Sequence, residues 1–379
     1  MEVIVYNSSE VNGTYNVTDQ GGQDYSDYPY VGELKQVPEW EVILKSLLFA
    51  VIIYFSLVGN FLIIVVVLRN RSMRTTTNYY IVNLAVADLL VTVCCMWVSL
   101  VDDVSEGWVL GAFFCKINTF TQVLSVVASV LSLTLIAYDR FFGIVFALKA
   151  HMTDRRARTS LILIWLSSAL IACPTLIYRQ LKVRVWKDHT ERWCDDDWPV
   201  SIGSDNNITT HSIPSRTAYY ATVSVVLYFI PMIVMTLAYS RIIMKLWMSA
   251  IPVEKMDKRV EAQARARKKV IVMLVAILVV FAVCWLPFQI ILLYSELRSN
   301  REALGDWYYD LTFAARLMAY SNSALNPLIY TGFNENFRRG IQRVWHCVSC
   351  KEKTNIYNNG YSYGHSYGSH DAATMPTSL

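Results

Sequence analysis

Long runs of apolar residues, separated by short polar links, recur along the chain. Seven such runs cover residues 43–68, 79–101, 112–138, 159–178, 217–247, 269–294 and 307–331. A helix needs about 20 apolar residues to cross the ~30 Å hydrocarbon core of a bilayer, and each run has that length. A soluble helical protein would have to bury every run on all sides. The pattern therefore predicts seven membrane-spanning helices in a single membrane domain.

The distribution of charge predicts which way these helices face. Only 17% of the 379 residues are charged, against about a quarter in soluble proteins. Basic residues close to span ends collect on the cytoplasmic side, and here they lie in the links after the first, third, fifth and last runs. We expect a multi-pass plasma-membrane protein with its N-terminus outside. The net charge of +4 is then explained by the basic residues that mark the cytoplasmic side, and no nucleic-acid partner is needed to account for it.

Two sets of residues agree with this orientation. Four N-glycosylation sequons all lie on the predicted outer side, at Asn7, Asn12, Asn16 and Asn207. Cys115 and Cys194 are the two cysteines on that oxidising side, so we expect a disulfide that holds the 179–216 link over the end of the bundle. On the inner side, Cys347 and Cys350 are candidates for palmitoylation, with free thiols as the alternative.

An acid–base pair, Asp139-Arg140, interrupts the third apolar run. A charged pair within a bilayer is costly unless it lies at the boundary or faces other protein. At ~1.5 Å per residue, a helix that starts near Cys115 reaches this pair after about 36 Å, at the cytoplasmic boundary. Arg140 could exchange Asp139 for another partner in a second state, or the pair could be a simple salt bridge at the end of the helix.

Short motifs on successive apolar runs carry a resemblance to a known family. In chain order they are Gly59-Asn60, Asn83-Leu-Ala-Val-Ala-Asp88, Asp139-Arg140-Phe141, Trp165, Pro231, Tyr239, Phe281-Ala-Val-Cys284-Trp285-Leu-Pro287 and Asn326-Pro327-Leu-Ile-Tyr330. In this order they resemble the rhodopsin-like (class A) G-protein-coupled receptors over about residues 42–347. The resemblance implies an all-α fold: a seven-transmembrane helix bundle with a short amphipathic eighth helix. It implies a receptor and no enzyme.

The resemblance also implies how the chain is organised and which proteins it meets. Residues 1–41 would form a glycosylated outer tail, 42–347 the receptor domain and 348–379 a disordered inner tail. A heterotrimeric G protein and arrestin would bind the inner side, and the spans and palmitoyl chains would contact membrane lipids. The last residues, Thr377-Ser378-Leu379, fit a PDZ-type strand-addition end.

The resemblance assigns roles to two groups inside the bundle. The implied allosteric sodium site comprises Asp88, Ser129, Asn322, Ser323 and Asn326. The alternative is a protonated or hydrogen-bonded structural aspartate, and no other cofactor or metal is expected. The implied switch and coupling residues are Asp139, Arg140, Tyr239, Phe281, Trp285, Pro287, Pro327 and Tyr330. The prolines each remove a backbone hydrogen bond and give the spans places to bend.

The nature of the ligand is suggested by the residues near the outer end. Gln122 stands seven residues after Cys115, where amine receptors of the family carry an aspartate, so an amine ligand is not expected. Glutamine there resembles receptors for neuropeptide Y, neuropeptide FF, RF-amide and orexin peptides, and its amide suits an amidated peptide end. The implied ligand-binding residues are Gln122, Asp102, Asp195, Asp196, Asp197, Glu296, Arg316 and Trp285.

The charges among these residues predict a basic peptide, because an acidic rim attracts a cationic ligand. The alternative is an acidic loop that is only solvated surface. Arg316 opposes the acidic trend, and it is expected to pair with Glu296 or Asp102 or to meet a ligand carboxylate.

Other functions stay open beside the neuropeptide receptor. Within the family they are a receptor for a non-amidated or cystine-bridged peptide, or an orphan receptor. A membrane transporter is more remote, because it would show repeated halves and broken spans, which the sequence lacks.

Overall fold

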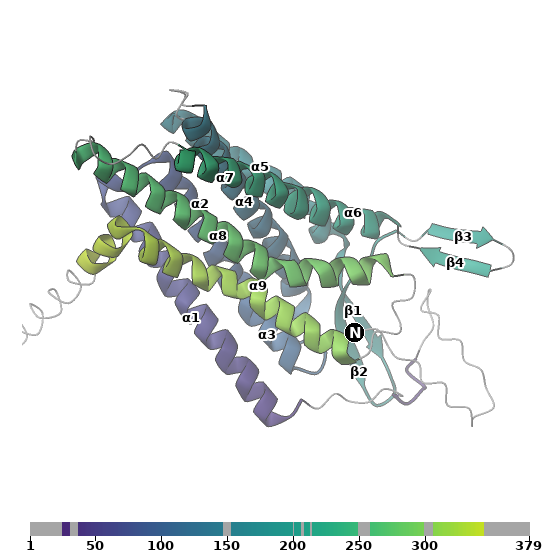
Figure 1. The fold of residues 1–379 in the computed structure, drawn as a ribbon. Helices are drawn as coiled ribbons and strands as arrows, with labels where there is room; N and C mark the ends of the chain where they lie inside the picture. Colours follow the sequence, from purple (N-terminus) through teal and green to yellow (C-terminus); the bar gives the residue numbers. More distant parts are fainter. Residues whose placement is uncertain are drawn as a thin grey trace, which may run out of the picture.

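The computed structural model describes residues 25–30, 37–146, 153–199, 201–205, 208–212, 214–248, 258–298 and 306–344. The predicted glycosylation sites, Cys347, Cys350 and the inner tail lie outside these residues. Long helices, arranged side by side as a bundle, make up most of the fold (Figure 1). They are α1 (Glu39–Arg69), α2 (Thr76–Val91), α3 (Trp97–Val104), α4 (Gly111–Val145), α5 (Asp154–Tyr178), α6 (Pro214–Ser224), α7 (Ile230–Met248), α8 (Lys258–Leu297) and α9 (Asp306–Phe333). A short 3₁₀ turn, Arg71–Met73, links α1 to α2.

The apolar runs correspond to these helices. Among the described residues, six helical segments are long and apolar enough to cross a membrane: Glu39–Arg69, Thr76–Val104, Gly111–Val145, Arg155–Tyr178, Pro214–Met248 and Lys268–Leu297. The seventh long helix, α9, packs against α1 and α8, but Arg316, Asn322 and Asn326 make it more polar. The predicted seven-helix bundle is confirmed, and the chain is a multi-pass membrane protein.

The surface of the bundle fits this environment. Large apolar side chains such as Leu163, Leu170 and Leu237 point outward and are more than half exposed. A soluble protein rarely exposes contiguous apolar surface of this extent, whereas lipid covers it without cost. The central core is one large cluster of buried apolar side chains between the helices, including Ile63 and Tyr80, with two smaller clusters beside it.

Polar residues set several helix ends. Thr75 accepts a hydrogen bond from the Asn78 N–H at the start of α2, and Thr153 accepts one from the Arg156 N–H at the start of α5. The helix α8 begins 11 residues before the predicted apolar run 269–294, at Lys258. The segment before the run is rich in Ala, Arg, Lys and Glu, which form helices well but are not apolar. The length of the apolar run therefore underestimates the length of α8.

Two membrane helices contain a wider turn that the sequence did not predict. Thr92–Met96 joins α2 to α3 as a π-helix, and Val225–Phe229 joins α6 to α7 in the same way. A π-turn accommodates one extra residue without ending the helix. α2 and α3 thus form one membrane span, and α6 and α7 form another.

The 179–216 link contains two antiparallel hairpins, which were not predicted. In the first, β1 (Arg179–Val185) pairs with β2 (Thr190–Asp196), with Leu181 opposite Cys194. In the second, β3 (Ser201–Asp205) pairs with β4 (Ile208–Ser212) and projects beyond α6 (Figure 1). The predicted disulfide Cys115–Cys194 is confirmed and joins β2 to α4. A hydrogen bond of 2.8 Å from the Trp108 N–H to the Arg192 carbonyl adds a second attachment.

Residues 25–30 of the N-terminal tail lie against the tip of the β1–β2 hairpin. The Lys187 N–H donates to the Tyr28 carbonyl at 3.0 Å, and the Tyr30 N–H donates to Asp188 Oδ1 at 2.8 Å. The Tyr25 and Trp186 rings are 5.0 Å apart. The tail is therefore attached to the same hairpin that the disulfide holds on the bundle.

A short helical stretch, residues 335–344, follows α9 after a break at Asn334. Asn334 Oδ1 accepts a hydrogen bond of 3.0 Å from the Asn336 N–H, as an N-cap does. Phe337 is fully buried beside Tyr330, with 5.9 Å between the ring centroids. This stretch lies where the eighth helix is expected, and its predicted amphipathic contact with the membrane surface stays a prediction.

Candidate ligand cavity

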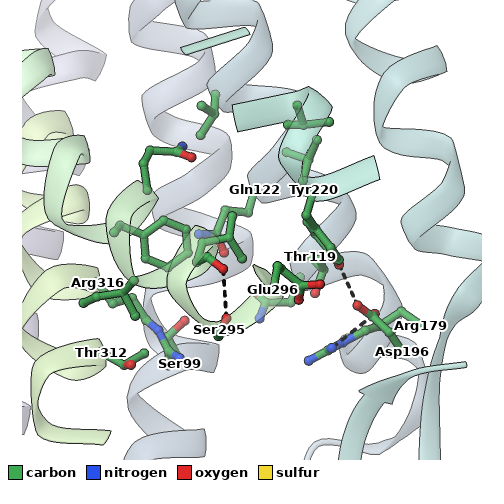
Figure 2. A pocket seen from close by; sticks show the side chains of 18 of the residues that line it. Ser99, Thr119, Gln122, Arg179, Asp196, Tyr220, Ser295, Glu296, Thr312 and Arg316 are labelled. Atoms are coloured by element: carbon green, nitrogen blue, oxygen red, sulfur yellow. Dashed lines mark hydrogen bonds and ion pairs between the residues drawn. The ribbon is translucent and has the colours of Figure 1, made fainter. Parts of the chain in front are cut away.

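A cavity of about 350 Å³ lies at the end of the bundle that carries the β1–β2 hairpin. Residues of α3, α4, β1, β2, α6, α8 and α9 line it. Figure 2 shows polar side chains from several of these elements pointing into it. Its volume is in the range of small-ligand sites, or of the deepest part of a peptide.

Six of the eight residues predicted to bind ligand line this cavity: Gln122, Asp102, Asp196, Glu296, Arg316 and Trp285. Asp195 and Asp197 do not line it, and their contact with a ligand stays a prediction. Asp196 is the buried one of the three aspartates, while Asp195 Oδ1 lies 3.8 Å from the Arg216 Nη1. Asp197 instead pairs with Lys182 at 2.8 Å on the exposed side of the hairpin.

The inward acids are held by arginines. The Arg179 Nη1 lies 3.2 Å from Asp196 Oδ1, and the Tyr220 hydroxyl donates to Asp196 Oδ2 at 2.7 Å (Figure 2). The Arg216 Nε lies 3.3 Å from Glu296 Oε1 and 3.7 Å from Asp196 Oδ2. The expected acidic cup is therefore an ion network in which acids and bases alternate.

Sequence reasoning missed Arg179 and Arg216 as cavity residues. Arg179 directly follows α5, and Arg216 lies 15 residues before Pro231, about four helical turns toward the hairpin end. Their distance along the chain from the acids hid the pairing. A search for basic residues at the outer ends of spans could have found both.

Arg316 also has a different partner from those predicted. Its Nη1 lies 3.3 Å from Asp103 Oδ1, so α9 is bridged to α3, and no ion pair to Glu296 or Asp102 is present in the described structure. Asp103 is the residue next to the predicted partner Asp102 on α3. Asp102 remains exposed at the cavity edge and makes no ion pair with any described residue.

Four residues around the cavity each have a buried polar side-chain atom that makes no hydrogen bond within the described residues: Asn118 Oδ1, Gln289 Oε1, Trp285 Nε1 and Thr312 Oγ1. Gln289 and Trp285 are only 6% and 5% exposed. Buried polar atoms in folded proteins are almost always paired, because leaving one unpaired costs about 1–3 kcal/mol. Unpaired acceptors and donors on side chains around one cavity favour a polar ligand.

Near the middle of the bundle, Asp88 is almost fully buried. The Ser323 hydroxyl donates to Asp88 Oδ1 at 2.7 Å, and Asn326 Nδ2 donates to Asp88 Oδ2 at 2.8 Å. Ser129 and Asn322 are buried too, and the amide oxygens of Asn322 and Asn326 make no hydrogen bond within the described residues. Oxygen atoms of this kind suit a hard cation, and the hydrogen-bonded aspartate alternative fits the same contacts.

At the opposite end, the Asp139–Arg140 pair is formed. The Arg140 Nη2 lies 3.3 Å from Asp139 Oδ2 and also donates to Thr77 Oγ1 of α2. Tyr239 and Tyr330 are buried, and neither hydroxyl bonds to Arg140 here. Between the two ends, Phe281 and Trp285 face each other with 6.1 Å between ring centroids.

Two of the predicted switch residues are prolines inside helices: Pro287 in α8 and Pro327 in α9. Pro327 lies against Gly59 of α1, where an added Cβ would come within 2.7 Å of the proline ring. The absence of a side chain at Gly59 lets α1 and α9 approach closely at Pro327.

Comparison with known proteins shows the family to which the fold belongs. The family model described as 7 transmembrane receptor (rhodopsin family) matches residues 59–330. The chain is 34% identical over 312 residues to the tachykinin-like peptides receptor 99D of Drosophila melanogaster, which covers 82% of the chain and 58% of that protein. It is 30% identical over 313 residues to the substance-P receptor of Mus musculus, covering 82% of the chain and 72% of that receptor.

The match to neuropeptide FF receptor 2 of Mus musculus is longer. Identity is 32% over 364 residues, which cover 92% of the chain and 84% of that receptor. By contrast, the chain spans less than two thirds of the length of the two fly receptors for tachykinin-like peptides. The similarity therefore extends over the whole helix bundle.

Proposed function

Because the chain belongs to the rhodopsin family of seven-transmembrane receptors, we propose that it is a receptor for an extracellular neuropeptide. Peptide binding at the hairpin end would favour a conformation that promotes nucleotide exchange on a heterotrimeric G protein at the opposite end. Receptors for tachykinin-like peptides, substance P and neuropeptide FF are among its relatives, which supports a peptide ligand. The family comprises receptors and not enzymes.

The observation that carries this proposal is the set of buried polar atoms that make no hydrogen bond on the side chains around the cavity. Asn118 Oδ1 and Gln289 Oε1 accept hydrogen bonds, and Trp285 Nε1 donates one. A primary carboxamide offers two N–H donors and one carbonyl acceptor, so it can pair with all three. A ligand carboxylate has no donor for the two amide oxygens. The cavity thus favours a peptide that ends in an amide, with Gln122 as a further contact.

The charge of the rest of the peptide follows from the cavity edge. Asp102 is exposed there without an ion pair among the described residues, while Asp196, Glu296 and Asp103 face arginines. A basic side chain next to the amidated end would find Asp102 available. We infer a peptide that is amidated and basic.

We also infer that the N-terminus faces outside. The disulfide Cys115–Cys194 requires an oxidising compartment, and residues 25–30 contact the same hairpin. The inner end carries the basic links. Arrestin binding and a PDZ partner at the C-terminus are part of the proposal and rest on the sequence alone.

The test is a panel of synthetic neuropeptides applied to cells that express the chain, with calcium and cyclic AMP as readouts. Each peptide is supplied as its carboxamide and as its free acid. We expect the active peptide to be at least about tenfold more potent as the amide, equivalent to about 1.4 kcal/mol. A response confined to free-acid or cystine-bridged peptides would contradict the proposed ligand class.

Cavity variants sharpen this test. Gln289→Leu should reduce the difference in potency between amide and acid, because it removes an acceptor for the amide N–H. Ser295→Ala is the matched control, since the Ser295 hydroxyl lines the same cavity but already donates to the Leu292 carbonyl at 2.9 Å. Equal effects of the two substitutions would argue against an amide site at Gln289.

A further inference from the structure

Arg216 connects three elements at the mouth of the cavity. From α6, its Nε reaches Glu296 of α8 at 3.3 Å and Asp196 of β2 at 3.7 Å. Its Nη1 lies 3.8 Å from Asp195. The Thr217 hydroxyl, on the next residue, donates to the Glu296 backbone carbonyl at 3.3 Å. The guanidinium therefore links the hairpin, α6 and α8.

Both acids that the Arg216 Nε contacts are buried. The Asp196 side chain is 2% exposed and also receives Arg179 and the Tyr220 hydroxyl. The Glu296 side chain is 3% exposed, and its Oε1 lies 3.3 Å from the Arg216 Nε. A buried carboxylate that loses its cation is strongly destabilised. Glu296 is therefore a carboxylate whose charge is already matched from within the protein.

Resting on the proposed function, we propose that Arg216 is a specificity-determining residue that occupies Glu296 in place of a ligand cation. A ligand guanidinium reaches Glu296 only by displacing Arg216, which keeps Asp196 and Asp195 as partners after the exchange. The exchange replaces one arginine–carboxylate pair by another, so the net gain in binding energy is smaller than at an unpaired acid.

The exchange also has a mechanical consequence. While Arg216 contacts Glu296, the outer ends of α6 and α8 are linked by this ion pair. A ligand cation that takes over Glu296 removes this ion pair and leaves the Thr217 hydrogen bond to the Glu296 carbonyl, so binding is coupled to a weaker connection between the two helix ends. The cavity therefore favours ligands whose cation reaches Glu296 in a geometry that can compete with Arg216.

The geometry favours arginine over lysine in the ligand. A guanidinium forms two parallel hydrogen bonds to a carboxylate, whereas an ammonium acts as a point charge. Arg216 itself makes one contact to Glu296, from its Nε to Oε1 at 3.3 Å, so a ligand guanidinium that forms both hydrogen bonds competes with it better than an ammonium does.

The experiment uses small probes, so that it does not depend on finding the natural peptide. The purified full-length receptor in lipid nanodiscs is titrated with L-argininamide and with L-citrullinamide, a neutral analogue of similar shape. Binding is measured as the rise in thermal unfolding temperature with probe concentration. Signalling is not read out, so failure of the peptide panel and failure of this proposal are distinguishable.

We expect Arg216→Gln to bind argininamide about tenfold more tightly than the wild type, which corresponds to about 1.4 kcal/mol. Citrullinamide should bind both proteins equally. In the double variant Arg216→Gln/Glu296→Gln the gain should disappear, since the carboxylate that the probe would take is gone. Equal or weaker argininamide binding by Arg216→Gln would overturn the proposal.

Two further variants serve as a control outside the cavity and as a fallback if the first variant does not fold. Lys182→Gln removes the Lys182–Asp197 pair of 2.8 Å on the same hairpin but outside the cavity, and it should bind both probes as the wild type does. Arg216→Lys keeps the charge and is the fallback if Arg216→Gln does not fold. It should bind argininamide more tightly than the wild type, and an unchanged affinity would contradict the exchange.

Discussion

Arg316 of α9 and Asp103 of α3 form an ion pair across the cavity wall, with 3.3 Å between Nη1 and Oδ1. Both side chains are about four-fifths buried, at 22% and 18% exposure. The pair therefore joins two spans that are far apart in sequence, and it removes Arg316 from the charges available to a ligand.

Asp103→Asn should lower the free energy of unfolding by about 1–3 kcal/mol, because it leaves the Arg316 guanidinium without its carboxylate. The measurement is thermal unfolding of the receptor in nanodiscs. Asp102→Asn is the matched control at the neighbouring position and should change stability by less than about 0.5 kcal/mol. Equal loss in the two variants would show that the Arg316 pair contributes nothing specific.

Gly59→Ala should destabilise the bundle by about 1–3 kcal/mol, since the added methyl must push α1 away from Pro327. Gly332 of α9 has nothing within 4 Å of an added Cβ. Gly332→Ala should be neutral, or stabilising by up to about 1 kcal/mol from helix propensity. Thermal unfolding of both variants tests the contrast, and a tolerated Gly59→Ala would contradict the close approach.

The Asp88 site predicts an effect of sodium. Sodium chloride should raise the unfolding temperature relative to choline chloride at the same ionic strength, because a ligand that binds only the folded state stabilises it. At ten times its Kd the gain is about 1.4 kcal/mol. Asp88→Asn should abolish the difference and Asp102→Asn should retain it. Identical unfolding in both salts would favour the hydrogen-bonded structural aspartate.

Removal of the disulfide should release the hairpin. The bond closes a loop with a sequence separation of 79 residues, so Cys115→Ser/Cys194→Ser should cost about 4 kcal/mol. Amide hydrogen exchange in residues 179–196 should become faster, and surface expression should fall. Cys173→Ser, which alters an exposed free cysteine of α5, serves as the control. Normal protection of the hairpin in the double variant would contradict the anchoring role.

The sequence predicted the fold better than it predicted the cavity. Apolar length is a local property, so each membrane helix was visible in its own stretch of chain. The early start of α8 at Lys258 was hidden because helix propensity without hydrophobicity gives no membrane signal. The π-turns were hidden because one additional residue does not change an apolar run.

The cavity depends on contacts between distant segments. Gln122 and Trp285 were placed by their position on a single helix and do line it. Asp195 and Asp197 do not line the cavity, and the strand β2, which determines how this part of the 179–216 link is oriented, was not predicted. The partners of Glu296 and Arg316 lie 80 and 213 residues away in sequence, and nothing local to either residue indicates them.

The π-turn Val225–Phe229 also affects how this receptor is compared with others. One surplus residue turns everything beyond it by about 100° around the helix axis. A residue count that starts at Pro231 and assumes a regular helix toward the hairpin end therefore places Arg216 and Tyr220 on the wrong face of the helix. The count is correct only when one residue is left out at the π-turn. If a mutagenesis scan is planned from a regular helical wheel, substitutions intended for the lipid-facing side will fall in the cavity. An alignment with a relative that has a regular helix needs a one-residue gap at this turn.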